Sequence, residues 1–161
     1  MSPPPQPPLE KSVWTDADFD HMGWHDAAVH ALATEGEDEN PGRLLLDLDY
    51  ILEWVPPSGE ETRFNFWIAP ATLVFDHAWD LTVDIELHTT ALELELDAIT
   101  RTPDQPFGRS TWTLEGHNFT ASVTSEGFRQ YLRAEPIWSP RQRLDAAQRG
   151  SISFTETGYA E

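Results

Sequence analysis

The stretch LLLDLDYILEW, residues 44–54, indicates the fold class because apolar residues occupy every second position. Its even-numbered residues, from Leu44 to Trp54, are all apolar, whereas its odd-numbered residues include Asp47, Asp49 and Glu53. A period of two is typical of a β-strand that buries one face. We therefore predict a long strand whose even-numbered face enters the core and whose acidic side chains lie on the other face.

The rest of the chain repeats this pattern in shorter pieces, which are separated by turns that contain Pro and Gly. Short strands at hairpin spacing are typical of antiparallel sandwiches and barrels. The prediction is a mainly β protein, an antiparallel β-sandwich or a partly closed β-barrel of about eight or nine strands. The further strands are expected at residues 27–33, 63–68, 72–76, 81–87, 91–99, 110–115, 119–125, 128–134 and 151–154.

Two helices are predicted, one near each end of the chain. Thr15 and Asp18 have the spacing of a capping box, and Gly23 is suited to end a short N-terminal helix. Ser139 is a favourable cap for a C-terminal helix over residues 140–149, which has Pro at its first position and Gly after its last.

The length of 161 residues fits one domain. Five of the first eight residues are proline, and they include no apolar anchor, so this end is expected to be extended and mobile. We therefore expect residues 1–12 to form a disordered Pro-rich tail and residues 13–161 to form a single globular β-rich domain.

The formal net charge of −18 excludes several functions. Nucleic-acid binding and adhesion to anionic membranes both need basic surfaces. The sequence also lacks an apolar run as long as a membrane span and a recognisable signal peptide, so a cytoplasmic location is expected. Because the chain has no cysteine, disulfides, thiolate metal sites and cysteine nucleophiles are ruled out.

The charge is unevenly distributed along the chain. Residues 1–100 hold 21 acidic and three basic side chains, whereas residues 101–161 hold seven of each. If residues 81–87 and 91–96 form a hairpin, Glu86 lies opposite Glu93 and Asp84 lies opposite Glu95, and such like-charge pairs are destabilising. A basic partner that neutralises the face would offset this repulsion. The residues assigned to this acidic face are Asp47, Asp49, Glu53, Asp84, Glu86, Glu93, Glu95 and Asp97.

These observations favour a non-enzymatic acidic protein that binds a basic protein partner through one sheet face. A solvated face that only keeps the protein soluble remains the simpler interpretation. No nucleophile elbow, phosphate-binding loop or dinucleotide fingerprint is present, so no catalytic residue and no cofactor are predicted.

The segment around residues 20–30 supplies an alternative function. His21, His25, Asp26 and His30 are metal-capable side chains, and His21 and His25 have i, i+4 spacing. The alternative is a metal-binding module or metal-dependent hydrolase that uses these residues or the clustered strand carboxylates. A local capping or packing role for His25 and Asp26 competes with it. A further alternative is a dimeric structural module whose interface is the neutral second half of the chain.

Three stretches carry a resemblance to known sequences: MGWHDAAVHALA at 22–33, LLLDLDYILEWV at 44–55 and FWIAPATLVFDHAWDLTVDIE at 66–86. Together they resemble a group of uncharacterised bacterial hypothetical proteins, which implies a bacterial, cytoplasmic origin and supplies no catalytic residue. The protein is also similar in kind, though not in motif, to the small acidic immunity proteins that neutralise bacterial toxins. That likeness implies an inhibitor-like role against a basic partner.

Overall fold

The computed structural model describes residues 3–38, 40–88, 90–104 and 107–160. The prediction of a mainly β protein with two short helices is confirmed. The elements in chain order are β1 (Val13–Thr15), the 3₁₀ helix η1 (Asp16–His21), β2 (Ala27–Glu37), β3 (Asn40–Val55), β4 (Asn65–Ile85), β5 (Leu94–Asp104), β6 (Arg109–Gly116), β7 (Phe119–Ser125), β8 (Gly127–Leu132), β9 (Ile137–Ser139) and α1 (Ala146–Arg149).

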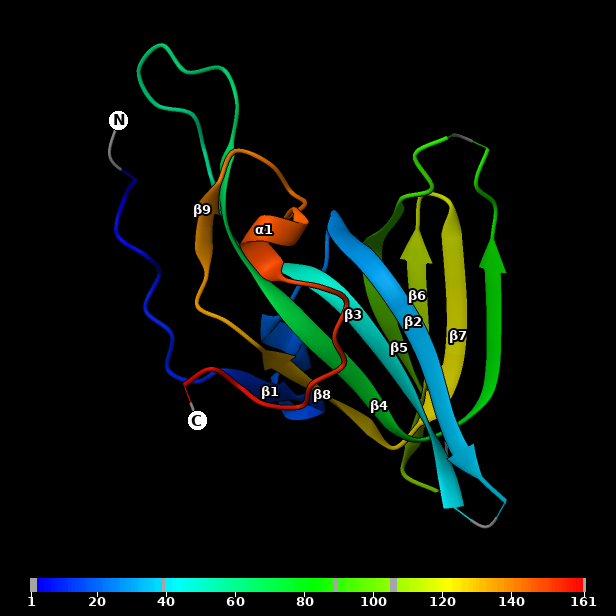
Figure 1. Ribbon diagram of the computed structural model, residues 1–161. Coiled ribbons are helices and arrows are strands. Elements are labelled where there is room, and N and C mark those ends of the chain that lie inside the picture. The colour runs from blue at the N-terminus through cyan, green and yellow to red at the C-terminus, as the bar shows by residue number, and fades with distance from the viewer. Residues whose placement is uncertain (1–2, 39, 89, 105–106, 161) are drawn as a thin grey trace.

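The strands form one antiparallel sheet that closes on itself (Figure 1). Its order is β1-β8-β4-β3-β2-β5-β6-β7, and β7 pairs back to the second half of β4. The short β9 pairs with the start of β4. This ring of hydrogen-bonded strands confirms the prediction of a sandwich or partly closed barrel.

The long strand β4 joins the two sides of the ring. It spans 21 residues and replaces three shorter predicted strands, 63–68, 72–76 and 81–87. Its first part pairs with β3 and β8, whereas its second part pairs with β7. The change of partner coincides with left-handed backbone at His77 (φ 48°) and Asp80 (φ 52°) and with a register shift between Trp79 and Thr82. The strand therefore bends, and it carries the sheet around the barrel corner without a loop.

The even-numbered face of β3 enters the core, as its alternation predicts. Leu44, Leu46 and Leu48 are buried there with the aromatic rings of the other strands. A register shift between Ile51 and Glu53 ends the regular alternation. For this reason the ring of the next even-numbered residue, Trp54, leaves the main core and packs with Phe66 in a second cluster.

The N-terminal helix forms as predicted, whereas the C-terminal helix is shorter. Thr15 and Asp18 make both bonds of a capping box at the start of η1. The helix predicted over residues 140–149 is wrong in extent, because only α1 is helical and its cap is Asp145. Ser139 instead accepts a hydrogen bond from the Arg141 backbone N–H and forms a turn. The stretch 151–154 is not a strand.

Part of the predicted tail contacts the rest of the protein. Leu9 packs against the main core, and Ser12 is fully buried. The Ser12 carbonyl accepts a hydrogen bond from the Leu132 backbone N–H. None of the helices in the described part of the chain has the length and apolarity needed to span a membrane.

The predicted hairpin of residues 81–87 and 91–96 does not form. Asp84 in β4 lies opposite Thr120 in β7, and Glu95 in β5 lies opposite Ala28 in β2. Both acidic residues therefore face an uncharged neighbour, which avoids the like-charge repulsion of the local hairpin. The ring closure separates the two strands, because β5 lies between β2 and β6.

Candidate functional site

Asp47 and Asp49 were assigned to an exposed acidic face, and that assignment is wrong. Both side chains are fully buried on the outer face of β3. The segment that follows β9, including α1, covers this face (Figure 1). Neither carboxylate is therefore accessible to a partner protein.

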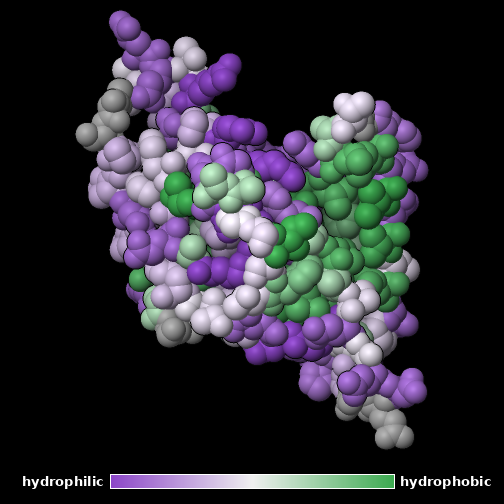
Figure 2. Space-filling model, in the orientation of Figure 1, coloured by the Kyte–Doolittle hydropathy of each residue, from purple (hydrophilic) through white to green (hydrophobic). Residues whose placement is uncertain are grey.

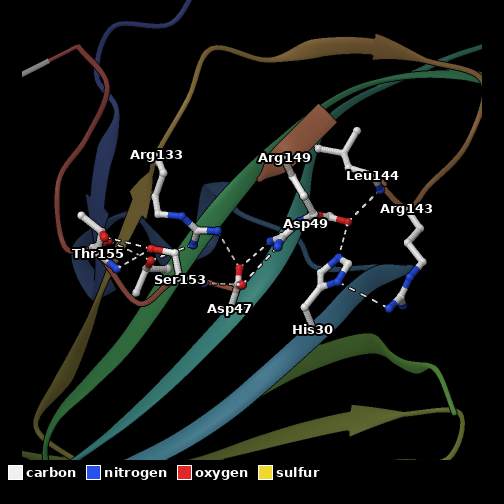
Figure 3. A network of polar contacts seen from close by, with 10 residues as sticks. His30, Asp47, Asp49, Arg133, Arg143, Leu144, Arg149, Ser153 and Thr155 are labelled. Atoms are coloured by element: carbon white, nitrogen blue, oxygen red, sulfur yellow. Dashed lines mark hydrogen bonds and ion pairs between the residues drawn. The ribbon is translucent and has the colours of Figure 1, made fainter. Parts of the chain in front are cut away.

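Asp47 is held by two arginines and one backbone amide (Figure 3). Arg133 Nη2 donates to Asp47 Oδ1 at 2.7 Å, and Arg149 donates to both carboxylate oxygens. The Ser153 backbone N–H donates to Asp47 Oδ2 at 3.0 Å. Burial alone raises the pKa of Asp47, but the hydrogen bonds from Arg149, Ser153 and Arg133 outweigh it, so the pKa lies below its ordinary value.

Asp49 extends the same network toward β2. Arg149 Nε donates to Asp49 Oδ1 at 2.9 Å, and the Leu144 backbone N–H donates to Oδ2 at 2.9 Å. His30 Nε2 lies 2.7 Å from the same oxygen, while Arg143 Nη2 lies 3.4 Å from His30 Nδ1. A neutral His30 with its proton on Nε2 satisfies both contacts, as donor to Asp49 and acceptor from Arg143.

This network holds residues 140–155 against the outer face of β3. We refer to Asp47, Asp49, Arg133 and Arg149 as the buried ion cluster. Burial lowers the pKa of Arg149, but its hydrogen bonds to Asp47 and Asp49 dominate and raise it. Arg133 and Arg149, from the second half of the chain, thus pair with carboxylates of the acidic first half. His30, assigned to the alternative metal site, belongs to this network instead.

The other residues assigned to the acidic face remain accessible. Glu95 is half-buried, and the rest are exposed. Asn118 links the acidic segments, because its side-chain Nδ2 donates to the Glu93 carbonyl and its backbone carbonyl accepts from the Glu86 backbone N–H. The exposed residues are Glu53, Asp84, Glu86, Glu93 and Asp97.

Four of the predicted site residues meet where β2 begins beside β5. We define the carboxylate cluster as Asp26, Glu95 and Asp97, together with His25. Ligand atoms of His25, Asp26 and Asp97 all lie within 4.8 Å of one another. The Glu95 carboxyl shares a hydrogen bond with that of Asp26. Half of the alternative metal set is therefore brought together, whereas His21 lies at the end of η1 and is outside the cluster.

Local backbone features place these side chains. Asp26 has left-handed backbone (φ 61°), which short polar side chains tolerate better than most, and it immediately precedes β2. The pairing of Ala27 with Leu96 then sets Asp26 next to β5. Gly116 permits the close approach of β6 to β5, because a Cβ at this position would lie 2.0 Å from the Glu95 carbonyl oxygen.

The carboxylate cluster borders an open groove of about 510 Å³. The groove has an aromatic wall of Trp54, Phe64 and Phe66, whose rings pack edge to face. The His25 ring stacks on Trp54 with centroids 5.5 Å apart. Acidic residues from β5 and from the segments before β2 and β5 line the groove, and three arginines line it as well. The charged lining residues are Asp26, Glu93, Glu95, Arg63, Arg141 and Arg143.

Sequence reasoning missed the aromatic and amide members of this groove. Gln142 Nε2 donates to Asp26 Oδ2 at 2.8 Å, so the turn before α1 supports the cluster from the far end of the chain. Neither Gln142 nor Phe64 carries a sequence signal that would single it out. The proximity of the four cluster residues depends on the β2–β5 pairing, which local periodicity does not specify.

The crowding of carboxyl groups gives Glu95 an unusual titration. Burial, the hydrogen bond with Asp26 and the negative charges of Asp26 and Asp97 raise the pKa of Glu95 to about 7 from its ordinary 4.5. The folded protein therefore binds a proton more tightly than the unfolded chain does. The contribution of Glu95 to stability is therefore fully present with Glu95 protonated, below its ordinary pKa of 4.5, and is lost as the pH rises through about 7.

Replacing Glu95 with Gln is expected to remove this pH dependence. The Tm of the wild-type protein should fall as the pH rises from 4.5 to above 7, whereas the Glu95→Gln variant should lack that component. Thermal unfolding followed by circular dichroism at a series of pH values measures the difference. The control is Glu93→Gln, which removes a neighbouring exposed carboxylate. Parallel pH profiles for wild type and Glu95→Gln would contradict the assigned titration.

Comparison with known proteins finds no matching family model, no matching curated protein and no matching solved structure.

Proposed function

We propose that this chain is a non-enzymatic binding protein that recognises a basic protein partner. The carboxylate cluster and its groove form the recognition site, and one cationic side chain of the partner enters it. The observation that carries the proposal is the Asp26–Glu95 carboxyl pair, which lies beside Asp97 at the edge of an aromatic-walled groove. The partner is expected in the bacterial cytoplasm, and the role is inhibitor-like, as for immunity proteins.

The distribution of internal ion pairs supports this proposal. Arg133 and Arg149 are used inside the buried ion cluster, and Arg129 pairs with Asp76. No Lys or Arg ion pair within the described ranges reaches Glu93, Glu95 or Asp97. Among the described residues these carboxylates thus have no Lys or Arg ion-pair partner, and an external cation would relieve the repulsion that Asp26 and Asp97 exert on Glu95.

The chemistry of the groove fits a Lys or Arg side chain. Carboxylates give charge-assisted hydrogen bonds to such a group, and the face of an indole attracts a cation. A guanidinium also stacks on aromatic rings, as the exposed ring of Phe64 allows. Arg63 lies in the β3–β4 connection, and Arg141 and Arg143 lie in the segment before α1. Because these arginines repel a cation, the incoming side chain binds on the β2–β5 side of the groove. They also offer donors to polar groups that flank this cation.

A labelled hexaarginine peptide is a probe for this site. Fluorescence anisotropy is expected to show binding that weakens as salt rises, because charge attraction is screened. The triple variant Glu93→Gln/Glu95→Gln/Asp97→Asn should bind at least about tenfold more weakly, which corresponds to ~1.4 kcal/mol. Binding should also strengthen as the pH rises through about 7, where Glu95 gains its charge.

A matched control separates a specific site from net charge. The variant Glu10→Gln/Glu60→Gln/Glu135→Gln removes the same number of carboxyl groups from exposed positions outside the groove. It is expected to bind hexaarginine nearly as well as the wild-type protein. Equal losses in the two triple variants would refute a localised site and leave only a solvated acidic surface.

A divalent-cation site is the second candidate function, and the grouping of His25, Asp26 and Asp97 favours it. Imidazole and carboxylate are ligands that Zn²⁺ accepts. If this function holds, Zn²⁺ raises the Tm of the wild-type protein but not that of His25→Ala/Asp97→Asn. A Tm that is unchanged by Zn²⁺, Mn²⁺, Ca²⁺ and Mg²⁺ would eliminate the candidate.

A further inference from the structure

In the part of the chain that the structure describes, the second half of β4, residues 79–85, has a partner strand on one edge only. It pairs with β7 through residues such as Val83 and Asp84. On the other edge, β3 pairs with β4 only as far as Ala78. Within the described ranges, no strand continues the sheet beyond that edge. Its backbone N–H and C=O groups are therefore open to another extended chain.

The same stretch presents apolar side chains that the fold leaves uncovered. Val83 is 40% exposed and Ile85 is 47% exposed, although the alternation of this strand predicts a buried face. Leu92, in the connection to β5, is 64% exposed. Figure 2 shows apolar residues gathered on the side of the molecule where Figure 1 places β2 and the second half of β4. An exposed apolar face on a free sheet edge is typical of an interaction surface.

The charge around this edge limits what can cover it. Asp84 and the following Glu86 are exposed next to the apolar positions, and Asp80 precedes them. A second copy of this chain carries the same net charge of −18, so electrostatic repulsion opposes self-association. The N-terminal stretch of this chain is also a poor occupant, since its prolines lack the backbone N–H that a ladder needs.

We propose that residues 79–85 bind an extended segment of the basic partner by strand addition. The segment alternates apolar with basic residues: its apolar side chains lie beside Val83 and Ile85, and its basic side chains lie beside Asp84. The backbone ladder gives affinity, and the alternation gives specificity. This inference rests on the proposed function and adds to it a binding mode and a second contact region.

A heptapeptide that alternates lysine and valine tests the inference. A second peptide of the same sequence, N-methylated at every residue, keeps the charge but lacks the backbone donors for a ladder on either edge. The wild-type protein should bind the unmodified peptide at least about tenfold more tightly than the methylated one. The variant Val83→Ser/Ile85→Ser should lose about tenfold in affinity. Its control, Ile152→Ser, changes an exposed apolar residue elsewhere and should bind normally.

The other outcomes separate this inference from the proposed function. Equal binding of both heptapeptides would overturn strand addition while leaving charge-driven recognition intact. Binding of hexaarginine at the carboxylate cluster without binding of either heptapeptide would likewise overturn strand addition and leave charge-driven recognition intact. Sedimentation at high salt that shows a dimer, abolished by Val83→Ser/Ile85→Ser, would assign the edge to a second copy and also overturn the inference.

Discussion

Replacing Asp47 with Ala is expected to lower the free energy of unfolding by about 3–5 kcal/mol, because it leaves two buried arginines with the single carboxylate of Asp49. The side chains of Arg149 and Arg133 are only 3% and 9% exposed, and both donate to Asp47. The Ser153 backbone N–H also loses its acceptor. Residues 140–155 should therefore detach from the outer face of β3. Urea unfolding followed by tryptophan fluorescence measures the change.

The matched control for Asp47→Ala is Asp84→Ala, which removes an exposed carboxylate from another strand. It should change the stability by no more than about 0.5 kcal/mol. The pKa of Asp47 lies below its ordinary value, so its contribution is present at neutral pH and is lost only as the pH falls through that lowered pKa. A loss below about 1 kcal/mol in Asp47→Ala would mean that the buried ion cluster does not hold the C-terminal segment.

Replacing Trp112 with Ala is expected to cost about 3–5 kcal/mol through the cavity that it leaves. Trp112 is fully buried, and its ring centroid lies 5.3 Å from those of Phe19 and Phe128 and 5.9 Å from that of Phe75. These rings join η1, β4, β6 and β8, so the cavity loosens contacts between several elements. The same urea unfolding experiment measures the loss.

Two further variants sharpen the Trp112 prediction. Phe107→Ala removes an aromatic ring that is 71% exposed and should change the stability by no more than about 0.5 kcal/mol. Trp112→Phe should cost clearly less than Trp112→Ala, because it keeps most of the ring and removes a buried indole N–H that has no hydrogen-bond partner among the described residues. Equal losses in Trp112→Phe and Trp112→Ala would show that ring packing is not the main contribution of Trp112 to stability.

Strand positions and the mainly β class were predictable because a period of two is a local property. The alternation in residues 44–54 correctly places Leu44, Leu46 and Leu48 in the core. Periodicity distinguishes the two faces of a strand, but it does not say whether the second face is covered. Asp47 and Asp49 are buried because Arg133 and Arg149, far along the chain, supply both the cover and the charge.

Strand pairing was predictable only in part, for a related reason. A hairpin of residues 81–87 and 91–96 is the shortest connection, and it suits the alternation of both segments. The ring closure overrides it, since β7 pairs with the second half of β4 and β2 pairs with β5. The carboxylate cluster follows from this nonlocal pairing, which is why Asp97 and Glu95 meet His25 and Asp26. The sequence contained all four residues as candidates but assigned them to two different sites.

Recognition of a cation at the carboxylate cluster can be tested by titrating ¹⁵N-labelled protein with unlabelled hexaarginine and following the amide signals by NMR. We expect the shift changes to concentrate at residues 25–28, 93–97 and 140–143, around the groove that Asp26 and Glu95 share. We also expect Glu93→Gln/Glu95→Gln/Asp97→Asn to abolish them. Shift changes of equal size at the other acidic stretches, 16–20, 35–38 and 60–61, would refute the site, because they would show attraction to net charge alone.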